Sequence, residues 1–305
     1  MESLKKYRIF GNGYSPKFLD YVSKQFAIDQ NSFRLASRRL HPRNTIVKIG
    51  AVPFGDSKVF PVIAGPCGLD TKENAIKIAN LLKKSGASVF RGFLWKGRTD
   101  AYTFQGVGEK GLGWLEEIKN RTGLPIDIEI LNEQHLDLVK DLVDVVQIGS
   151  RNMQNYSLLK AVGRTNIPVI LKNSPGSGLD ELLCAAEYIL KGGNRNVILC
   201  LRGTKPLTGS FSRFSLDMCA FPILKQLTHL PIIGDPTQSA NNATIIPNVA
   251  MSIAASGADG LLVEVHTNPK EALTDKKQLL DYNQFRQTSI YLNKLIKIYG
   301  KKLSK

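Results

Sequence analysis

The sequence is poor in cysteine and histidine, with four residues of each among 305. Four cysteines in a chain of this length do not make the disulfide framework of a small secreted protein, and they indicate a reducing, cytoplasmic compartment. No apolar run reaches about 18 residues, so we expect no membrane-spanning helix. The first residues, MESLKKYRIFGNG, lack an apolar core and a small-residue cleavage site, so we expect no secretory signal there.

Acidic residues are also scarce. The chain has 26 Asp and Glu against 41 Lys and Arg, which gives a formal charge of +15. Residues 1–60 carry eleven basic and four acidic residues, and residues 281–305 carry six and one, so the excess lies at the two ends. No run of five Lys or Arg and no zinc-finger spacing occurs, which does not favour nucleic acid as a partner. The apolar content of 43% excludes wholesale disorder.

From residue 59 onward, short apolar runs alternate with longer segments of helical spacing. The runs are nearly apolar on both faces, as in the strands of a parallel sheet. Eight such units in about 240 residues predict an α/β fold, a (β/α)8 TIM barrel. A doubly wound open sheet is the alternative, but the turn GPCGLD after the first run is not GxGxxG. The predicted strands are 59–64, 88–93, 126–130, 145–149, 168–172, 196–200, 231–234 and 260–265. The predicted helices are 71–86, 109–123, 132–143, 155–164, 178–193, 215–227, 245–257 and 276–300.

Residues 1–58 stand outside this alternation, so we predict an N-terminal extension over 1–58 and a barrel domain over 59–305. The extension contains one candidate helix, 15–27, and two candidate strands, 33–37 and 45–50. We expect it to cover the floor of the barrel. Within the barrel, Pro222 is expected to kink or interrupt its helix because proline removes a backbone hydrogen bond.

Chemistry in such a barrel lies where the strands end and the following loops begin. Six basic side chains occur at these ends, and a cluster of this kind repels itself unless anions fill it. Arginine offers a planar fork that matches phosphate and carboxylate oxygens, and lysine offers a compact charge. The pattern predicts a site for phosphorylated, carboxylated small molecules, although any one cation alone could be a solvated loop residue. The six are Arg91, Lys96, Arg98, Arg151, Lys172 and Arg202.

A second group at the strand ends consists of Cys67, Glu264 and Asp275, with His266 nearby. A thiolate and carboxylates from separate loops could hold a divalent transition metal. The alternative is a buried thiol beside carboxylates that pair with the cations. These residues share no short motif, so spacing does not choose between the two interpretations.

The same stretches resemble the 3-deoxy-arabino-heptulosonate 7-phosphate (DAHP) synthases, and more narrowly their short branch, which is related to the 3-deoxy-manno-octulosonate 8-phosphate (KDO8P) synthases. The resemblance runs from about residue 33 to 285. It implies a (β/α)8 barrel, a transferase that condenses phosphoenolpyruvate with a phosphorylated aldose, a divalent metal such as Mn²⁺, and a homo-oligomer. It is carried in order by VIAGPC (62–67), RGF and KGRTDAYTFQG (91–106), QIGSRNMQN (147–155), ILK (170–172), ILCLRG (198–203), LTHLPIIGDP (227–236) and ADGLLVEVH (258–266).

The resemblance also implies roles for single residues. Arg91 and Lys96 match the pair beside the carboxylate and reacting carbons of phosphoenolpyruvate, and Glu129 matches an acidic residue of the pocket. These three are the candidate catalytic residues. The candidate substrate ligands are Arg98 and Thr99 for the aldose phosphate, and Gly149, Ser150, Arg151, Lys172 and Arg202 for phosphoenolpyruvate. The candidate metal ligands are Cys67, Glu264, Asp275 and, at the position of the family's histidine, Gln238.

Several departures make this chain a divergent member. The family's DPSH motif reads DPTQ here, so that Gln238 offers an amide where an imidazole would bind zinc, iron or manganese better. The aldose motif KPRTSP reads KGRTDA, which places the carboxylate of Asp100 where it would oppose a phosphate. The phosphoenolpyruvate half is kept and the acceptor half is altered. We therefore expect a condensing enzyme whose acceptor differs from erythrose 4-phosphate; the alternative is a non-catalytic homologue that binds a phosphometabolite and regulates a partner.

Overall fold

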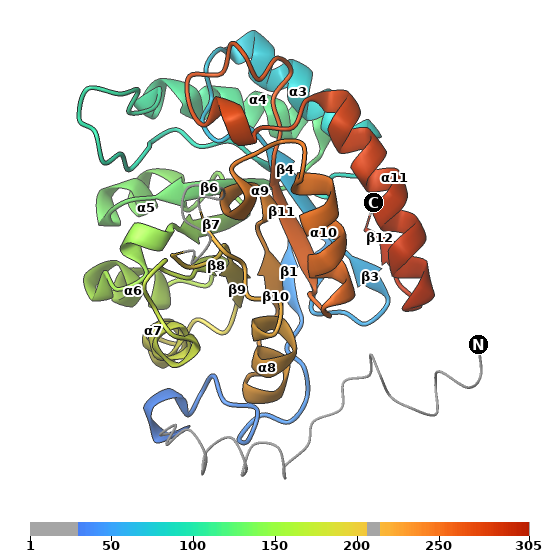
Figure 1. Cartoon of the computed structure of the whole chain (residues 1–305). Coiled ribbons are helices and arrows are strands. Elements are labelled where there is room, and N and C mark those ends of the chain that lie inside the picture. The colour runs from blue at the N-terminus through green and yellow to red at the C-terminus, as the bar shows by residue number, and fades with distance from the viewer. Residues whose placement is uncertain (1–29, 206–213, 305) are drawn as a thin grey trace.

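The structure is a computed structural model and describes residues 30–205 and 214–304 (Figure 1). The predicted helix at 15–27 lies outside these residues. A closed barrel of eight parallel strands, in the order β10-β11-β4-β5-β6-β7-β8-β9, forms the centre of the molecule. This confirms the predicted (β/α)8 fold, and each predicted run overlaps one barrel strand, with β4 and β9 extending one residue further. The strands are β4 (Val62–Gly65), β5 (Val89–Arg91), β6 (Ile126–Ile130), β7 (Val145–Ile148), β8 (Val169–Lys172), β9 (Val197–Leu201), β10 (Ile232–Gly234) and β11 (Gly260–Glu264).

Helices surround the barrel (Figure 1). Their starts follow the local sequence: Thr71 caps the first by accepting from the backbone N–H of Asn74, and Asp281 caps the last in the same way with Gln284. The helices are α3 (Lys72–Lys84), α4 (Leu112–Thr122), α5 (Glu133–Val139), α6 (Tyr156–Gly163), α7 (Leu179–Lys191), α8 (Ala220–Leu227), α9 (Pro236–Ala240), α10 (Ile246–Ala255) and α11 (Tyr282–Ile298). Short 3-10 turns complete the set: η1 (Gln30–Phe33), η2 (Gly108–Gly111), η3 (Ser150–Asn152) and η5 (Lys276–Gln278).

Three predicted helices begin three or more residues later than expected, and one of them is 109–123, where a 3-10 turn precedes Leu112. The segment 215–227 becomes helical only at Ala220, so Pro222 lies in the first turn of α8, where its missing N–H has no partner to lose. Proline therefore marks the start of this helix and does not kink it. In 276–300, residues Lys276–Gln278 form a 3-10 turn, and the Asp281 cap places the start of α11 at Tyr282.

Side chains alternate between the two faces of each barrel strand. One set packs against the surrounding helices, and the other meets inside the barrel. The inner set is closed at the amino-terminal end of the strands by an antiparallel hairpin, β1 (Val47–Ile49) and β2 (Val52–Phe54). The hairpin includes part of the predicted strand at 45–50, and its four apolar side chains are buried against inner residues of the barrel. The floor is therefore an apolar plug. The domain boundary at residue 58 remains a prediction.

The predicted strand at 33–37 is wrong. Its apolar residues Phe33 and Ala36 are buried, but the segment is a turn after η1 and makes only an isolated bridge at Ser37. The backbone N–H groups of Leu35 and Ala36 donate to the carboxylate of Glu187 on α7, at 2.8 and 2.9 Å. The Glu187 carboxylate thus accepts the backbone hydrogen bonds that a neighbouring strand would accept in a sheet.

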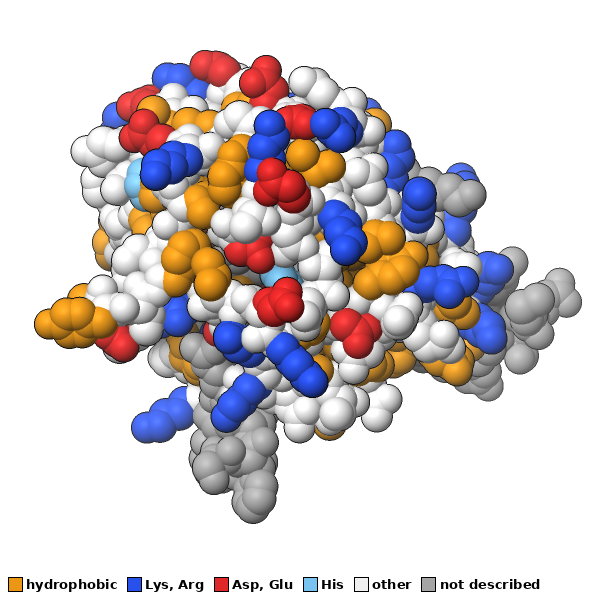
Figure 2. Space-filling model, turned by 90° about the horizontal axis from the view of Figure 1, so that it is seen from above, with side chains coloured by type: hydrophobic (Ala, Val, Ile, Leu, Met, Phe, Trp, Pro, Cys, Tyr) orange, Lys and Arg blue, Asp and Glu red, His pale blue; other side chains and the backbone are white. Residues whose placement is uncertain are grey.

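The ends of the barrel unit lie together. Residues 59–64 contain β3 (Val59–Phe60) as well as β4, and β3 pairs in parallel with β12 (Lys302–Leu303) outside the barrel. Among the described residues, no helix has both the length and the apolar character needed to cross a bilayer. On the face shown in Figure 2, basic side chains share the surface with acidic ones.

Candidate active site

One cavity of about 370 Å³ opens at the carboxyl ends of the barrel strands. All fourteen residues singled out from the sequence line it, although they come from eight different loops and strand ends. Convergence of this kind follows from the fold, because parallel strands deliver their last residues to the same rim. The fourteen are Cys67, Arg91, Lys96, Arg98, Thr99, Glu129, Gly149, Ser150, Arg151, Lys172, Arg202, Gln238, Glu264 and Asp275.

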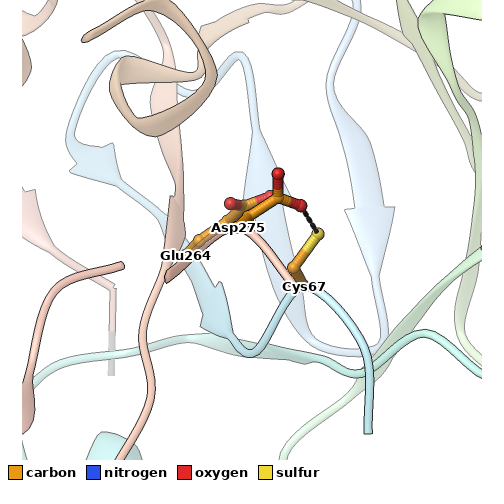
Figure 3. Close-up of side chains that lie close together, drawn as sticks. All are labelled: Cys67, Glu264 and Asp275. Atoms are coloured by element: carbon orange, nitrogen blue, oxygen red, sulfur yellow. Dashed lines mark hydrogen bonds between the residues drawn. The ribbon is translucent and has the colours of Figure 1, made fainter. Parts of the chain in front are cut away.

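Cys67, Glu264 and Asp275 form a compact group on one side of the cavity (Figure 3). Their thiol and carboxylate atoms all lie within 4.8 Å of one another. The Cys67 thiol donates to Oδ2 of Asp275 at 3.0 Å, and Nζ of Lys96 donates to Sγ of Cys67 at 3.0 Å. One sulfur and two carboxylates at this spacing fit the ligand set of a divalent transition metal.

Gln238, which the sequence predicts as the fourth ligand, lines the same cavity and has other partners. Its Oε1 accepts from Nη2 of Arg202 at 2.9 Å, and its Nε2 donates to Oε1 of Glu264 at 2.7 Å. The second oxygen of Glu264 accepts from Nε2 of Gln278 at 2.6 Å. Gln238 therefore links Arg202 to Glu264, and its amide oxygen faces a guanidinium group.

Burial and nearby charge set the ionisation of this group. Burial, and then the charge of Glu264, raise the pKa of Cys67 far above its usual range, so the thiol stays protonated. Burial also opposes ionisation of Glu264, but the Arg91 guanidinium, 3.4 Å from Oε1, holds the pKa of this carboxyl below its usual value. The site thus presents a neutral thiol beside a carboxylate, and a metal would bind the thiol with release of its proton.

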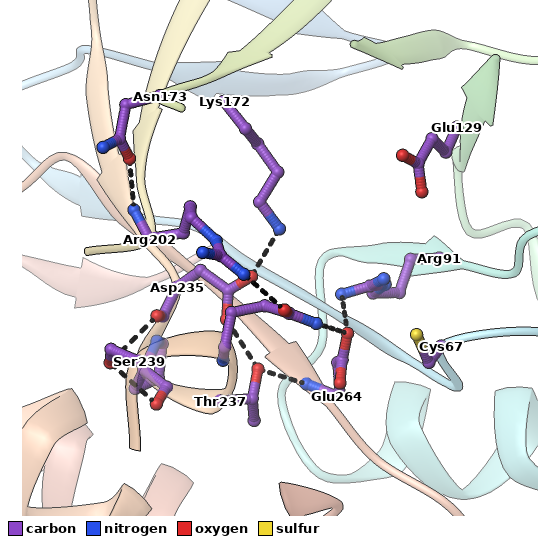
Figure 4. Close-up of polar contacts among 12 residues, drawn as sticks. Cys67, Arg91, Glu129, Lys172, Asn173, Arg202, Asp235, Thr237, Ser239 and Glu264 are labelled. Carbon is purple, nitrogen blue, oxygen red and sulfur yellow. Dashed lines mark hydrogen bonds and ion pairs between the residues drawn. The ribbon is translucent and has the colours of Figure 1, made fainter. Parts of the chain in front are cut away.

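Three further buried cations line the cavity; Arg91 lies beside Glu264, and Lys172 and Arg202 lie further from Cys67 (Figure 4). Nζ of Lys172 lies 2.5 Å from Oδ2 of Asp235, and the guanidinium of Arg202 covers the ring of Phe214 at 3.7 Å. Arg91, which is 1% exposed, lies over the ring of Phe93 at 4.3 Å. Carboxylate partners and aromatic faces hold these cations in fixed orientations before any anion arrives.

The sequence places Asp235 among the polar residues at the strand ends but gives it no role, and it does not single out Phe93 or Phe214. Asp235 lies at the end of β10, and its Oδ1 also accepts from the backbone N–H of Gln238 at the start of α9. Its position in the DP dipeptide directly after a strand is a usable signal for such a residue. The two phenylalanines carry no sequence signal that separates them from core residues.

The side chains at the mouth of the cavity are more exposed than those deeper inside, and they carry charges of both signs. Nη2 of Arg151 donates to Oγ1 of Thr99 at 3.0 Å. Nε of Arg98 donates to Oγ1 of Thr103 at 3.1 Å, and its Nη1 lies 3.9 Å from Asp275. The exposed carboxylate of Asp100 lines the same mouth. An anion entering here meets two arginines and one repelling carboxylate.

Gly149 shows why the loop after β7 needs glycine. A Cβ built at this position would lie 1.8 Å from Oε1 of Glu129. Glu129 in turn is 3.8 Å from Nζ of Lys96. Any side chain at residue 149 would displace this carboxylate, so the close approach fixes both the loop and Glu129.

His266 is not part of the cavity. Its Nε2 lies 3.1 Å from Oδ2 of Asp70 and 3.1 Å from Nδ2 of Asn74, and its Nδ1 contacts the carbonyl of Asn268 at 2.7 Å. The ring is buried and its contacts tie the end of β11 to the loop before α3. The histidine near the cysteine in the expected site is thus a structural side chain.

Comparison with known proteins agrees with the fold and identifies the family. Residues 35–300 match the sequence profile of the DAHP synthetase I family. The chain is 39% identical to the phospho-2-dehydro-3-deoxyheptonate aldolase of Thermotoga maritima, over 89% of this chain and 80% of that protein. It is 26% identical to the 2-dehydro-3-deoxyphosphooctonate aldolase of Bartonella henselae, over 80% of this chain and 92% of that protein.

Solved structures give the same result. The DAHP synthase of Thermotoga maritima superposes with a TM-score of 0.84 at 38% identity, covering 88% of this chain and 78% of that chain. A truncated form of that protein superposes with a TM-score of 0.83 at 37% identity, covering 90% and 100%. The chain belongs to the DAHP synthetase I family, and these relatives are all named as enzymes.

Proposed function

We propose that the protein is a DAHP synthase-like transferase that condenses phosphoenolpyruvate with an aldose and releases inorganic phosphate. The observation that carries the proposal is the meeting of Arg91, Lys172 and Arg202 with the Cys67–Glu264–Asp275 group in one cavity. Three prearranged cations fit an anion that carries both phosphate and carboxylate. The resemblance of this chain to enzymes with DAHP synthase activity supports the same choice of substrate.

In this proposal, Arg151, Lys172, Arg202 and the backbone of Gly149 and Ser150 bind phosphoenolpyruvate. Carbon 3 of the enol attacks the aldehyde carbon of the aldose, and Lys96 polarises the aldehyde oxygen. Water then adds to carbon 2, and phosphate leaves with cleavage of the C–O bond. Lys96 shares a proton with the aldehyde oxygen. The carboxylate of Glu129, 3.8 Å from Nζ of Lys96, can hold that proton.

Cys67, Glu264 and Asp275 would hold a divalent metal ion, which would act as a Lewis acid on the aldehyde. We propose that metal binding is weaker than with an imidazole at residue 238 and favours a harder ion such as Mn²⁺. Its support is the neutral amide at that position and the engagement of Gln238 with Arg202 and Glu264.

The acceptor half supports an altered aldose. Arg98 and Thr99 match the family's ligands for the aldose phosphate, but both have partners among neighbouring side chains, and Asp100 lies at the same mouth. A carboxylate there weakens the binding of a terminal phosphate and can accept hydrogen bonds from sugar hydroxyls. We propose an acceptor other than erythrose 4-phosphate.

The deciding experiment measures phosphate release from phosphoenolpyruvate with four- and five-carbon aldoses and with their terminal phosphates, and identifies each product by mass. We expect release with one aldose and a product that contains the three carbons of phosphoenolpyruvate. Tight binding of phosphoenolpyruvate without release for any aldose would favour the non-catalytic alternative. Fastest turnover of erythrose 4-phosphate would contradict the altered acceptor but not the reaction.

Cys67, Cys200 and Cys219 are free thiols, which fits the cytoplasmic location that we propose.

A further inference from the structure

At the floor of the cavity lie three buried polar side chains, of which the proposed function uses only Arg91. Arg91 on β5 and Asp127 on β6 are register partners in adjacent strands. Gln147 is on the next strand, β7, in register with Glu129. The neighbours of Asp127 along its strand pack outward, so Asp127 points into the barrel. Asp127, Arg91 and Gln147 are 0%, 1% and 2% exposed.

Several atoms of these three side chains have no hydrogen-bond partner among the described protein atoms. They are both carboxylate oxygens of Asp127, Oε1 of Gln147, and Nε and Nη1 of Arg91. Nη1 of Arg91 is ion-paired with Glu264 at 3.4 Å without a hydrogen bond. Buried polar groups are nearly always satisfied, and a buried water makes about three hydrogen bonds. One water can accept from Arg91 and donate to Asp127 and Gln147, which matches the donors and acceptors present.

The charges around Asp127 are finely balanced. Burial raises the pKa of this carboxyl to about 7, against the opposing effects of Arg91 and then Lys172, and Glu129 on the same strand adds to the rise. Cys200 on β9 faces the same interior, and burial raises its pKa to about 12, so it stays neutral. The other charged groups of the interior are already paired with Lys172 or Arg91: Asp235 and Glu264.

We propose that Asp127, Gln147 and Arg91 enclose a buried water molecule, and that Asp127 takes up a proton from solvent when an anion binds Arg91 in the cavity above. The anion cancels part of the positive potential that keeps Asp127 ionised, so the neutral carboxyl becomes the stable form. Anion binding is consequently tighter at lower pH in the neutral range. This inference rests on the proposed phosphoenolpyruvate site.

The test compares the wild type with Asp127→Asn, which keeps the shape of the side chain but does not titrate. Calorimetry of phosphoenolpyruvate binding at pH 7, in buffers of different ionisation enthalpy, counts the protons taken up, and inorganic phosphate serves as a second probe. A group with a pKa of about 7 is half protonated at pH 7, so it can take up at most about half a proton. We expect the wild type to take up several tenths of a proton more than Asp127→Asn. The matched control is Asp137→Asn on the exposed face of α5, which should behave as the wild type.

A second measurement needs no ligand. The folded pKa of Asp127 lies above that of the unfolded chain, so its contribution lowers stability as pH rises from about 4 towards 7 and levels off above the folded pKa. The melting temperature of Asp127→Asn relative to the wild type should therefore rise by several degrees between about pH 5.5 and 8. A difference in melting temperature that does not change with pH would overturn the proposal that Asp127 titrates in the folded protein. If Asp127→Asn does not fold, Asp127→Leu serves in both measurements.

The outcomes separate the two proposals. Binding of phosphoenolpyruvate with equal proton uptake in wild type and variant overturns the inference and leaves the proposed function intact. Failure of both anions to bind the wild type overturns the proposed function and the coupling together, while the melting data still decide whether Asp127 titrates. A high-resolution crystal structure without density between Asp127, Gln147 and Arg91 would overturn the water site.

Discussion

Arg151 is the exposed member of the predicted phosphate-binding set, and its guanidinium extends over the cavity mouth to Thr99. Arg151→Ala should weaken phosphoenolpyruvate binding by about 2 kcal/mol, roughly 30-fold in Kd, because a charge-assisted contact is lost. Exposure keeps the effect at the low end of the range for buried pairs. Calorimetry measures it, and Arg164→Ala, an exposed arginine at the end of α6, is the control. An unchanged Kd would remove Arg151 from the site.

We expect Gln238 to set the metal preference of the proposed Cys67–Glu264–Asp275 site. We expect protein stripped with a chelator to lose activity and to recover it best with Mn²⁺ or Mg²⁺ added singly. Gln238→His should bind Zn²⁺ at least about 10-fold more tightly than the wild type, since an imidazole is the stronger donor. Direct metal titration of the stripped protein measures this without an assay of turnover.

Gln238→Ala separates coordination from the link between Arg202 and Glu264, because it removes that link without adding a donor. Full activity after stripping would contradict the metal requirement. Equal Zn²⁺ affinity in wild type and Gln238→His would place residue 238 outside the coordination shell.

The residue positions of the site were predictable because polar side chains at the ends of eight apolar runs must share one rim if the runs form a barrel. Their partners were not predictable. Lys172 pairs with Asp235, and Arg202 stacks on Phe214, through contacts between segments that are distant in sequence. Nothing in the local sequence of Gln238 shows that its amide joins Arg202 to Glu264. Such choices depend on rotamers and distances that only the assembled barrel defines.

At the level of elements, the hairpin β1–β2 closes the barrel floor with buried apolar side chains. Phe54 is fully buried there, so Phe54→Ala should lower the free energy of unfolding by about 3–5 kcal/mol through lost burial and an unfilled cavity. Chemical denaturation measures the change. Ile46→Ala, at a half-exposed position beside the same hairpin, should cost far less. Equal changes in the free energy of unfolding for the two substitutions would show that the hairpin plug contributes little to stability.

The barrel strands and most helices could be predicted because each is a run of one clear periodicity with capping residues at its ends. The segment 33–37 could not, since buried apolar residues under a helix give the same short pattern as a strand. Only the contact of its backbone with Glu187 distinguishes the two. The late start of α8 could not be predicted, because Pro222 could lie inside a helix or in its first turn and both placements fit the sequence.

At the scale of the whole molecule, His229 joins the segment before the barrel to its body. Its ring contacts the carbonyl of Leu35 at 2.8 Å and Oγ1 of Thr45 at 2.7 Å. Burial lowers the pKa of His229 to about 4, against the hydrogen bond to Leu35, and the nearby charge of His41 adds to the lowering. The folded chain thus resists protonation that the unfolded chain accepts near pH 6.5.

The contribution of His229 to stability should therefore be complete above about pH 6.5 and should be lost between about pH 6.5 and 4, at up to about 1.4 kcal/mol per pH unit. The buried carboxyl of Asp127 acts in the opposite direction, so the wild type is compared with His229→Asn by denaturation at several pH values. His229→Asn, which cannot be protonated, should be less stable than the wild type at neutral pH, and this difference should shrink as the pH falls towards 4. A difference in stability that stays constant over this range would show that other groups cause the acid sensitivity.

The pairing of β12 with β3 and of β11 with β4 places the last residues of the barrel unit against its first. Each barrel strand after β4 pairs with the strand synthesised just before it. In contrast, Val62 of β4 pairs with Leu261, and Val59 of β3 pairs with Lys302, so these two pairings can form only after the later residues have been synthesised. During synthesis, the nascent chain can therefore stack its units in order yet cannot seal the seam. The edge of β4 therefore stays open until β11 has been synthesised and has left the ribosome. Closure of the barrel is then a long-range step, and we expect the chain to be most prone to misassembly before it occurs.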